Sequence, residues 1–365
     1  MLTQKPILPK FHKYKNYLKN IDSKRIYSNY GPLYFKTQKF LEKYLRLKNN
    51  SVVLTSSGDS ALYACLKYLK NKNKKKKYIL VPSFSFPSDI HSIINAGFEP
   101  FFLDVNYEDW SLSQHEIIKY SNKYKKKIAG ILIVSPFGYP LDIDSLIKLK
   151  IKTKTEIIYD AADTIFNLKN LKNINFFLTV SFHPTKNIPG NESGMIICKK
   201  SMEENFKSYL NFGQDKKRNV NIFGFNGKIS EYDCAILLAS LKSIAKIKNK
   251  IKNINHYIVK KISNSSIIIQ NNIGKYWYSN KIFFYCKSKN RIDIEKVFLK
   301  NKIRLFRPWT GKAMHLHKFF KNYKRGNLKN TLFLTNKILG IPLNNDIDKL
   351  NLDKIIKILN GLKKF

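Results

Sequence analysis

Arginine, acidic side chains and cysteine are all scarce in this chain, and long apolar runs are missing. Only 7 of its 67 basic residues are Arg, and Asp plus Glu number 25 in 365 residues, so the formal net charge is +42. The four cysteines lie far apart, at Cys65, Cys198, Cys234 and Cys286. Their scatter, with no Cys-x-x-Cys pair, predicts neither a disulfide framework nor a zinc site. The apolar runs are too short to span a bilayer and the start does not read as a signal peptide, so we expect a soluble, cytoplasmic protein without membrane partners.

The large positive charge has two interpretations. Lys and Arg neutralise phosphates, so one interpretation is a nucleic-acid-binding protein. The other is compositional bias, because Lys, Asn, Ile, Phe and Tyr share AT-rich codons and Asn alone occurs 38 times. A protein that reads bases is expected to use more Arg, whose planar fork bonds guanine at two atoms. We therefore favour bias and expect no nucleic-acid partner.

The first 230 residues alternate between short apolar runs and stretches of helical spacing. The apolar runs read as strands at 51–56, 78–82, 99–105, 128–137, 156–162, 176–182 and 194–198. Strands that are apolar on both faces are typical of a mostly parallel sheet covered by helices. The sequence therefore predicts an α/β/α sandwich as the large domain, with the lysine-rich runs 71–77 and 121–127 as solvated connectors.

A different pattern follows residue 229. One long helical stretch is predicted over 229–262, followed by a smaller α+β region. That region contains an apolar strand at 281–287, a helix from Asp293, an extended stretch at 302–309 and a closing helix at 348–363. We predict an N-terminal arm over 1–28, a large domain over 29–245 and a small C-terminal domain over 246–365.

Three predicted strand ends carry residues that suit a phosphate-containing ligand. Ser57 and Gly58 open a helix directly after a strand, and backbone N–H groups at such a start can bind a phosphate. Asp160 ends another strand, where a carboxylate could pair with a cation or cap a loop. Lys186 lies five residues after Ser181, in a His-, Pro- and Gly-containing loop rather than on a charged face. In α/β sheets, ligands bind at these carboxyl ends.

The order of these motifs resembles the DegT/DnrJ/EryC1/StrS family of sugar aminotransferases. The matching segments run from about residue 29 to the C-terminus in a common order. They are NYGPLYFKTQKFLEKYL (29–45), SSGDSAL (56–62), PSFSFPSDIHSIINAGFEPFFLDVN (82–106), FGYPLDID (137–144), YDAAD (159–163), SFHPTKN (181–187), ESGMI (192–196), NFG (211–213), GFNGKISEYDCAI (224–236) and ILGIPL (338–343). The resemblance implies a pyridoxal-phosphate enzyme of fold type I that acts as a homodimer.

The resemblance also assigns residues. Lys186 would bond covalently to the cofactor and then move a proton, and Asp160 would pair with the pyridine nitrogen. Phosphate would lie at Ser57, Gly58 and Asp59 with the Ser181 hydroxyl. The remaining cofactor contacts would come from Phe86 against one face of the ring, Ala162 on the other, Asp163 near the phenolic oxygen and Asn226 from the partner subunit. The Asp59 carboxylate would have to point away from a phosphate, although it could cap the helix.

The substrate follows from the same resemblance. Variants such as SFHPTK and FNGKISE look most like members that aminate dTDP-linked 4-keto-6-deoxyhexoses for glycan or O-antigen synthesis, with glutamate as the donor. Another keto-sugar or a keto-cyclitol remains an alternative. Asp59, Ser135 and Asp163 depart from the usual family residues, so a degenerate, non-catalytic cofactor-binding relative is a further alternative. His315 and His317 are placed either near the substrate's pyrophosphate or on the surface.

Overall fold

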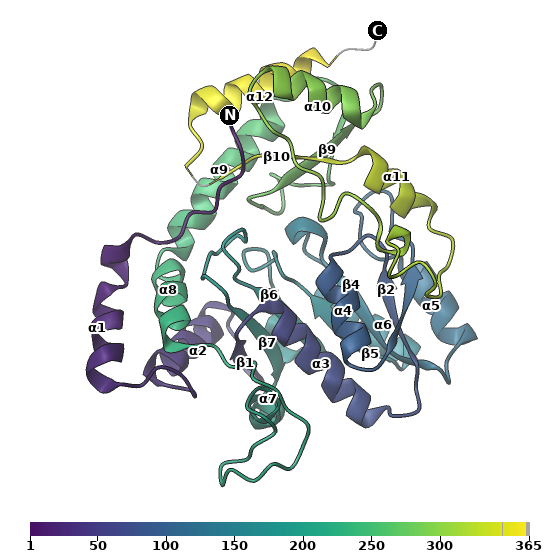
Figure 1. Ribbon diagram of the computed structural model, residues 1–365. Helices are drawn as coiled ribbons and strands as arrows, with labels where there is room; N and C mark the ends of the chain where they lie inside the picture. The colour runs from purple at the N-terminus through teal and green to yellow at the C-terminus, as the bar shows by residue number, and fades with distance from the viewer. Residues whose placement is uncertain (345, 363–365) are drawn as a thin grey trace.

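The large sheet forms the centre of the fold (Figure 1). The computed structural model describes residues 1–344 and 346–362. In this part of the chain, seven strands form one sheet in the order β1-β7-β6-β5-β4-β2-β3. Their bounds are β1 Asn50–Thr55, β2 Tyr78–Pro82, β3 Glu99–Leu103, β4 Ile128–Val134, β5 Glu156–Asp160, β6 Phe177–Ser181 and β7 Gly194–Lys199. β2 to β6 pair in parallel, whereas β7 runs antiparallel between β1 and β6.

Both faces of this sheet are buried. Neighbouring strand residues alternate between two hydrophobic clusters, as Val52 and Val53 of β1 do. One cluster includes residues of α2, α5, α6 and α8, and the other includes residues of α3, α4 and α7. The bounds of these helices are α2 Pro32–Tyr44, α3 Gly58–Lys72, α4 Pro87–Asn95, α5 Gln114–Lys123, α6 Ile143–Thr153, α7 Glu203–Leu210 and α8 Glu231–Leu241. The predicted α/β/α sandwich is confirmed.

The single helix predicted over 229–262 is wrong in one respect. It is two helices, α8 Glu231–Leu241 and α9 Ile244–Lys261, separated at Lys242 and Ser243. α8 is buried on almost every side, whereas α9 buries one stripe of Ile residues and exposes most of its lysines. The two helices therefore have different packing environments, which a continuous apolar pattern does not reveal.

The smaller C-terminal region packs around a second sheet. Among the described residues this sheet has three antiparallel strands in the order β10-β9-β8, namely β8 Ile267–Ile269, β9 Ile282–Cys286 and β10 Leu339–Ile341. The accompanying helices are α10 Arg291–Lys300, α11 Lys329–Lys337 and α12 Lys349–Gly361. The stretch 302–309 makes isolated bridges at Ile303 and Phe306 rather than a strand. The predicted boundary at residue 245 falls in the first turn of α9 and stays a prediction.

The N-terminal segment is attached to the body of the molecule. It contains α1 Lys15–Lys24, and Leu2 forms a parallel bridge with Ile303 of the small region. The backbone N–H of Leu2 donates to Lys302 O at 2.8 Å, and the backbone N–H of Arg304 donates to Leu2 O at 3.0 Å. Within residues 1–344 and 346–362, no helix combines the length and apolar character that crossing a membrane requires.

Two of the sequence motifs meet at the start of α2. The Glu231 carboxylate, which is almost fully buried, accepts hydrogen bonds from the backbone N–H of Leu33 at 2.7 Å and of Tyr34 at 2.8 Å. These N–H groups belong to the first turn of α2 and have no intrahelical acceptor. The carboxylate therefore caps α2 from α8, and it joins the 29–45 motif to the 224–236 motif.

Candidate active site

A cavity of about 730 Å³ opens where the parallel strands end. The wall on the side of the large sheet contains residues at or after the carboxyl ends of β4, β5 and β6, together with the first turns of α3 and α4. Thr3 and Gln4 of the N-terminal segment also line it. The small region contributes Lys281, Phe283, Arg304, Leu305, Phe306, Arg307 and Trp309. Three segments far apart in sequence thus enclose one site.

Two buried carboxyl groups face each other in this cavity. Asp160 ends β5, and Asp89 lies in the first turn of α4, where it accepts hydrogen bonds from Ser85 Oγ and from Phe86 N–H at 3.2 Å. Burial raises the pKa of Asp160 well above its usual range, and the Asp89 charge raises it further. Burial likewise raises the pKa of Asp89 to about 6, against the hydrogen bonds from Ser85 and Phe86. An additional cation at this point would favour the ionised form of Asp160.

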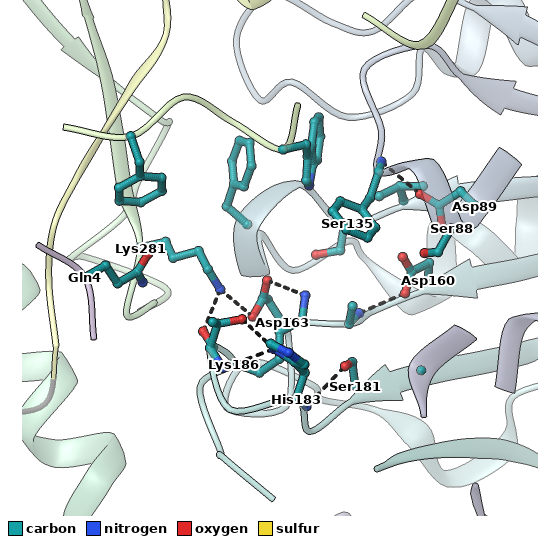
Figure 2. A pocket seen from close by; sticks show the side chains of 18 of the residues that line it. Gln4, Ser88, Asp89, Ser135, Asp160, Asp163, Ser181, His183, Lys186 and Lys281 are labelled. Carbon is teal, nitrogen blue, oxygen red and sulfur yellow. Dashed lines mark hydrogen bonds and ion pairs between the residues drawn. The ribbon is translucent and has the colours of Figure 1, made fainter. Parts of the chain in front are cut away.

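Lys186 lies near this pair but bonds to a different carboxylate. Its Nζ is 3.2 Å from Asp163 Oδ2, and Lys281 Nζ is 2.9 Å from the other oxygen of Asp163 (Figure 2). Burial acts to lower the pKa of Lys186, but Asp163, Asp160 and Asp89 together outweigh it and raise that pKa. Lys281 faces fewer carboxylates, so burial prevails and its pKa is lowered. Burial acts to raise the pKa of Asp163, but the two lysines prevail and lower it.

The start of α3 lies beside Ser181, and backbone N–H groups at a helix start can bind an anion. Ser57 is the N-cap, and its Oγ accepts from Ser60 N–H at 3.0 Å. A Cβ placed on Gly58 would lie 2.8 Å from Ser181 Cβ, so glycine allows the helix start to approach the end of β6. The Asp59 carboxylate accepts a hydrogen bond from Ser92 Oγ of α4 at 2.9 Å. The side-chain cap of α3 is therefore Ser57, which corrects the suggestion that Asp59 could cap it.

Three further predicted residues line the same cavity. Phe86 precedes α4 as its N-cap residue and is 49 % exposed, so its ring is free to contact a ligand. Ala162 donates its N–H to Asp160 Oδ1 at 3.0 Å, which fixes the turn after β5. Ser135 Oγ donates a hydrogen bond to the Tyr139 carbonyl at 2.5 Å and shares a second hydrogen bond with Thr164 Oγ1 at 2.6 Å.

The remaining candidates differ in position. In the described part of the chain, Asn226 does not line this cavity; its Oδ1 accepts from Lys228 Nζ at 3.2 Å on the exposed segment after α7. His183 lines the cavity, with Nε2 3.4 Å from Glu192 Oε1. His315 is buried against Ser83 Oγ at 2.7 Å, and neither His315 nor His317 is among the described residues that line the cavity.

Sequence reasoning missed Asp89 and Lys281. Asp89 looks in the sequence like an ordinary acidic residue in the first turn of a helix. Its position three residues after Phe86 is the one local sign that it belongs to the site. Lys281 is one of 60 lysines and precedes a strand of the small region, so no local signal distinguishes it. The N-terminal residues Thr3 and Gln4 likewise carry no motif.

Comparisons with known proteins agree with this geometry. The model of the DegT/DnrJ/EryC1/StrS aminotransferase family matches residues 12–360. A dTDP-4-amino-4,6-dideoxy-D-glucose transaminase of Shigella dysenteriae is 25% identical, with 98% of each chain covered. A GDP-perosamine synthase of Escherichia coli O157:H7 is 25% identical, covering 56% of this chain and 57% of its own. A Bacillus cereus structure described as a PLP-dependent aminotransferase superposes with a TM-score of 0.90 at 25% identity, covering 98% of each chain.

The fold and the cavity define an enzyme of the pyridoxal-phosphate-dependent aminotransferase class, with a lysine, a strand-end aspartate and a helix start around one cavity. The chain belongs to the DegT/DnrJ/EryC1/StrS aminotransferase family. Its cofactor is accordingly pyridoxal phosphate. The residues present fit this group, because the site offers a helix N-terminus with close approach at Gly58, a carboxylate pair for a ring nitrogen and a half-exposed aromatic side chain.

Substituting Gly58 with alanine is expected to weaken cofactor binding at least about tenfold, because the added methyl group would push α3 away from Ser181. Fluorescence titration of the cofactor-free protein with pyridoxal phosphate measures this. Gly361→Ala is the matched control, since a Cβ there meets nothing within 4 Å. Equal affinities for the Gly58 variant and the wild type would show that the phosphate binds elsewhere.

Proposed function

We propose that this enzyme transfers an amino group from glutamate to a nucleotide-linked keto-deoxysugar, such as a dTDP-4-keto-6-deoxyhexose, with Lys186 and Asp160 as its catalytic residues. The observation that supports the catalytic assignment is that Lys186, the start of α3 and Asp160 at the end of β5 line one cavity. The product would enter glycan or O-antigen precursor synthesis in the cytoplasm.

Each residue has a defined part. Pyridoxal phosphate, when bound, supplies an electron-withdrawing ring that stabilises negative charge on the carbon next to the transferred nitrogen. Asp160 would hold the positive charge of the ring nitrogen, and that charge would favour the ionised carboxylate of Asp160. Lys186 Nζ, as the neutral amine, would hold the cofactor covalently at its aldehyde carbon with release of water, and would move the proton at the reacting carbon once an amino donor has displaced it. Ser57, Gly58, Asp59 through its N–H and Ser181 would hold the phosphate, and Phe86 and Ala162 would hold the ring.

Two observations support a nucleotide-sugar substrate. Curated relatives from Shigella dysenteriae and Escherichia coli, which cover 98% of this chain, carry the name dTDP-4-amino-4,6-dideoxy-D-glucose transaminase. The cavity also has Arg304 and Arg307 on its small-domain wall, and guanidinium groups suit a diphosphate. Arg307 is already paired with Glu295 at 2.8 Å through two nitrogens, which leaves Arg304 as the principal candidate.

The test has two stages. Glutamate is expected to convert the bound cofactor from its visible-absorbing form to the amine form, which a spectrophotometer records. A panel of dTDP-, UDP- and GDP-linked keto-sugars is then added, and mass spectrometry identifies the aminated product. Failure with every amino donor would favour the non-catalytic alternative suggested by Asp59, Ser135 and Asp163. Amination of a UDP- or GDP-sugar, or of a keto-cyclitol, would replace the dTDP proposal.

We further propose a homodimer with a shared active site, in which Asn226 reaches the partner's phosphate. The exposed position of Asn226 outside its own cavity supports this arrangement. Light scattering measures the mass in solution. Mixing inactive Lys186→Ala and Asn226→Ala proteins should restore part of the activity if the site is shared, because some mixed dimers then contain one intact site.

A further inference from the structure

We propose that Lys281 is a positioning residue for Lys186: it stays paired with Asp163, so that this buried carboxylate keeps a lysine partner when Lys186 gives up its charge. This inference rests on the proposed function, because it takes Lys186 as the lysine that bonds the cofactor. Lys281 itself need not touch the reacting atoms.

The contacts assign one oxygen of Asp163 to each lysine. Lys281 Nζ lies 2.9 Å from Oδ1 and Lys186 Nζ lies 3.2 Å from Oδ2. Lys281 is also anchored by the Thr185 carbonyl at 3.0 Å, one residue before Lys186. Its side chain is 12% exposed and that of Asp163 is 9% exposed, so water screens this pair weakly. Figure 2 shows both lysines converging on Asp163 from different elements.

The charges explain why two lysines share one carboxylate. A buried carboxylate without a cation is strongly unfavourable, and Asp163 would be in that state after Lys186 became neutral if Lys281 were absent. The positive charge of Lys281 also opposes a second ammonium beside it, which favours the neutral amine of Lys186. Lys281 therefore stabilises Asp163 and at the same time assists the deprotonation that Lys186 needs for attack.

The other charged groups around the two lysines come from several elements. Asp160 of β5 and Asp89 of α4 face Lys186. His183, Glu192, Arg304 and Arg307 line the same cavity. All of these stay unchanged in the variants below, so a shift between variants reports on Lys281 and Asp163.

The experiment measures the protonation of Lys186 in four proteins: wild type, Lys281→Met, Asp163→Asn and the double variant. In the cofactor-free proteins, trace acetylation across a pH series followed by peptide mass spectrometry gives the pKa of Lys186. In the loaded proteins, the pH dependence of the visible absorbance gives the pKa of the lysine-bound nitrogen. Lys281→Arg retains the charge, and Lys275→Met removes an exposed lysine outside the cavity as the matched control.

The two single variants are expected to shift in opposite directions. Lys281→Met leaves Lys186 as the only lysine paired with Asp163. It should raise the pKa of Lys186 in the cofactor-free protein and that of the lysine-bound nitrogen in the loaded protein, each by about one unit or more. Asp163→Asn leaves an unpaired cation and should lower them by a similar amount. The double variant should lie between the single ones, while Lys281→Arg and Lys275→Met should match the wild type. If Lys281→Met does not fold, the double variant, which removes both buried charges, is compared with Asp163→Asn.

Unchanged pKa values in Lys281→Met, shifts of the same sign in both single variants, or a double variant identical to Asp163→Asn would overturn the inference. The acetylation readout needs no cofactor, so these results are separable from a failure of the proposed function. That failure would show as a wild-type protein in which Lys186 never bonds pyridoxal phosphate.

Discussion

Replacing Lys186 with alanine is expected to remove the visible absorbance band of the lysine-bound cofactor and to abolish amino transfer. The physical reason is that, in the proposed function, Lys186 Nζ supplies both the covalent bond to the cofactor and the proton transfer. Lys281 also lines the cavity, but both the Asp163 carboxylate and the Thr185 carbonyl already hold its Nζ. Absorbance spectra and a glutamate half-reaction measure the loss, which is expected to exceed about 10³-fold in rate.

Two controls make this result specific. Lys275→Met changes an exposed lysine on the loop before β9 and should retain the band. Thermal unfolding should show that the Lys186 variant remains folded, because the principal change is the loss of one of the two lysine charges that face Asp163. A band of unchanged intensity in Lys186→Ala would assign the cofactor to another lysine and would refute the site.

Replacing Asp160 with asparagine is expected to lower activity by about 10²–10³-fold while stabilising the cofactor-free protein. The activity falls because a neutral amide does not hold the ring nitrogen in its protonated form. The Asn oxygen can still accept the Ala162 N–H that now bonds to Oδ1, so the turn after β5 should persist. Steady-state kinetics and the half-reaction with glutamate measure the first effect.

The stability change follows from the direction of the pKa shift. Asp160 has a raised pKa in the folded state, so folding favours its protonated form, and this contribution is present at low pH and lost as the pH rises above the unfolded value of 3.8. Above that pH, the burial of the Asp160 carboxyl group beside Asp89 therefore opposes folding. Removing it should stabilise the cofactor-free protein by about 1–3 kcal/mol, measured by denaturant unfolding at pH 7.

Asp163→Asn provides a control of opposite sign. The pKa of Asp163 is lowered, so its contribution to stability is present above pH 3.8 and lost as the pH falls through its folded value. Its removal leaves two buried ammonium groups without their shared anion and should destabilise the protein at pH 7. If Asp160→Asn lowered the free energy of unfolding as much as Asp163→Asn does, this would show that Asp160 and Asp89 do not repel each other in the folded protein.

The large sheet and most of the candidate site residues could be predicted from the amino-acid sequence. Strands buried on both faces are apolar at consecutive positions, so hydrophobic pattern alone placed β1 to β7. Parallel strands bring their carboxyl ends to one edge, and this rule placed Gly58, Asp160, Ser181 and Lys186 near one another. The motif order then identified the family.

Which charged side chains pair with one another is visible in the three-dimensional structure and not in the sequence. Asp163 and Lys281 are 118 residues apart, and a lysine-rich sequence gives no local sign that one particular lysine is buried against a carboxylate. The same holds for Asp89 against Asp160, for Thr3 and Gln4 in the cavity wall and for the break between α8 and α9. Apolar periodicity records which face of an element is buried, whereas pairing between buried charges depends on how distant elements pack against one another.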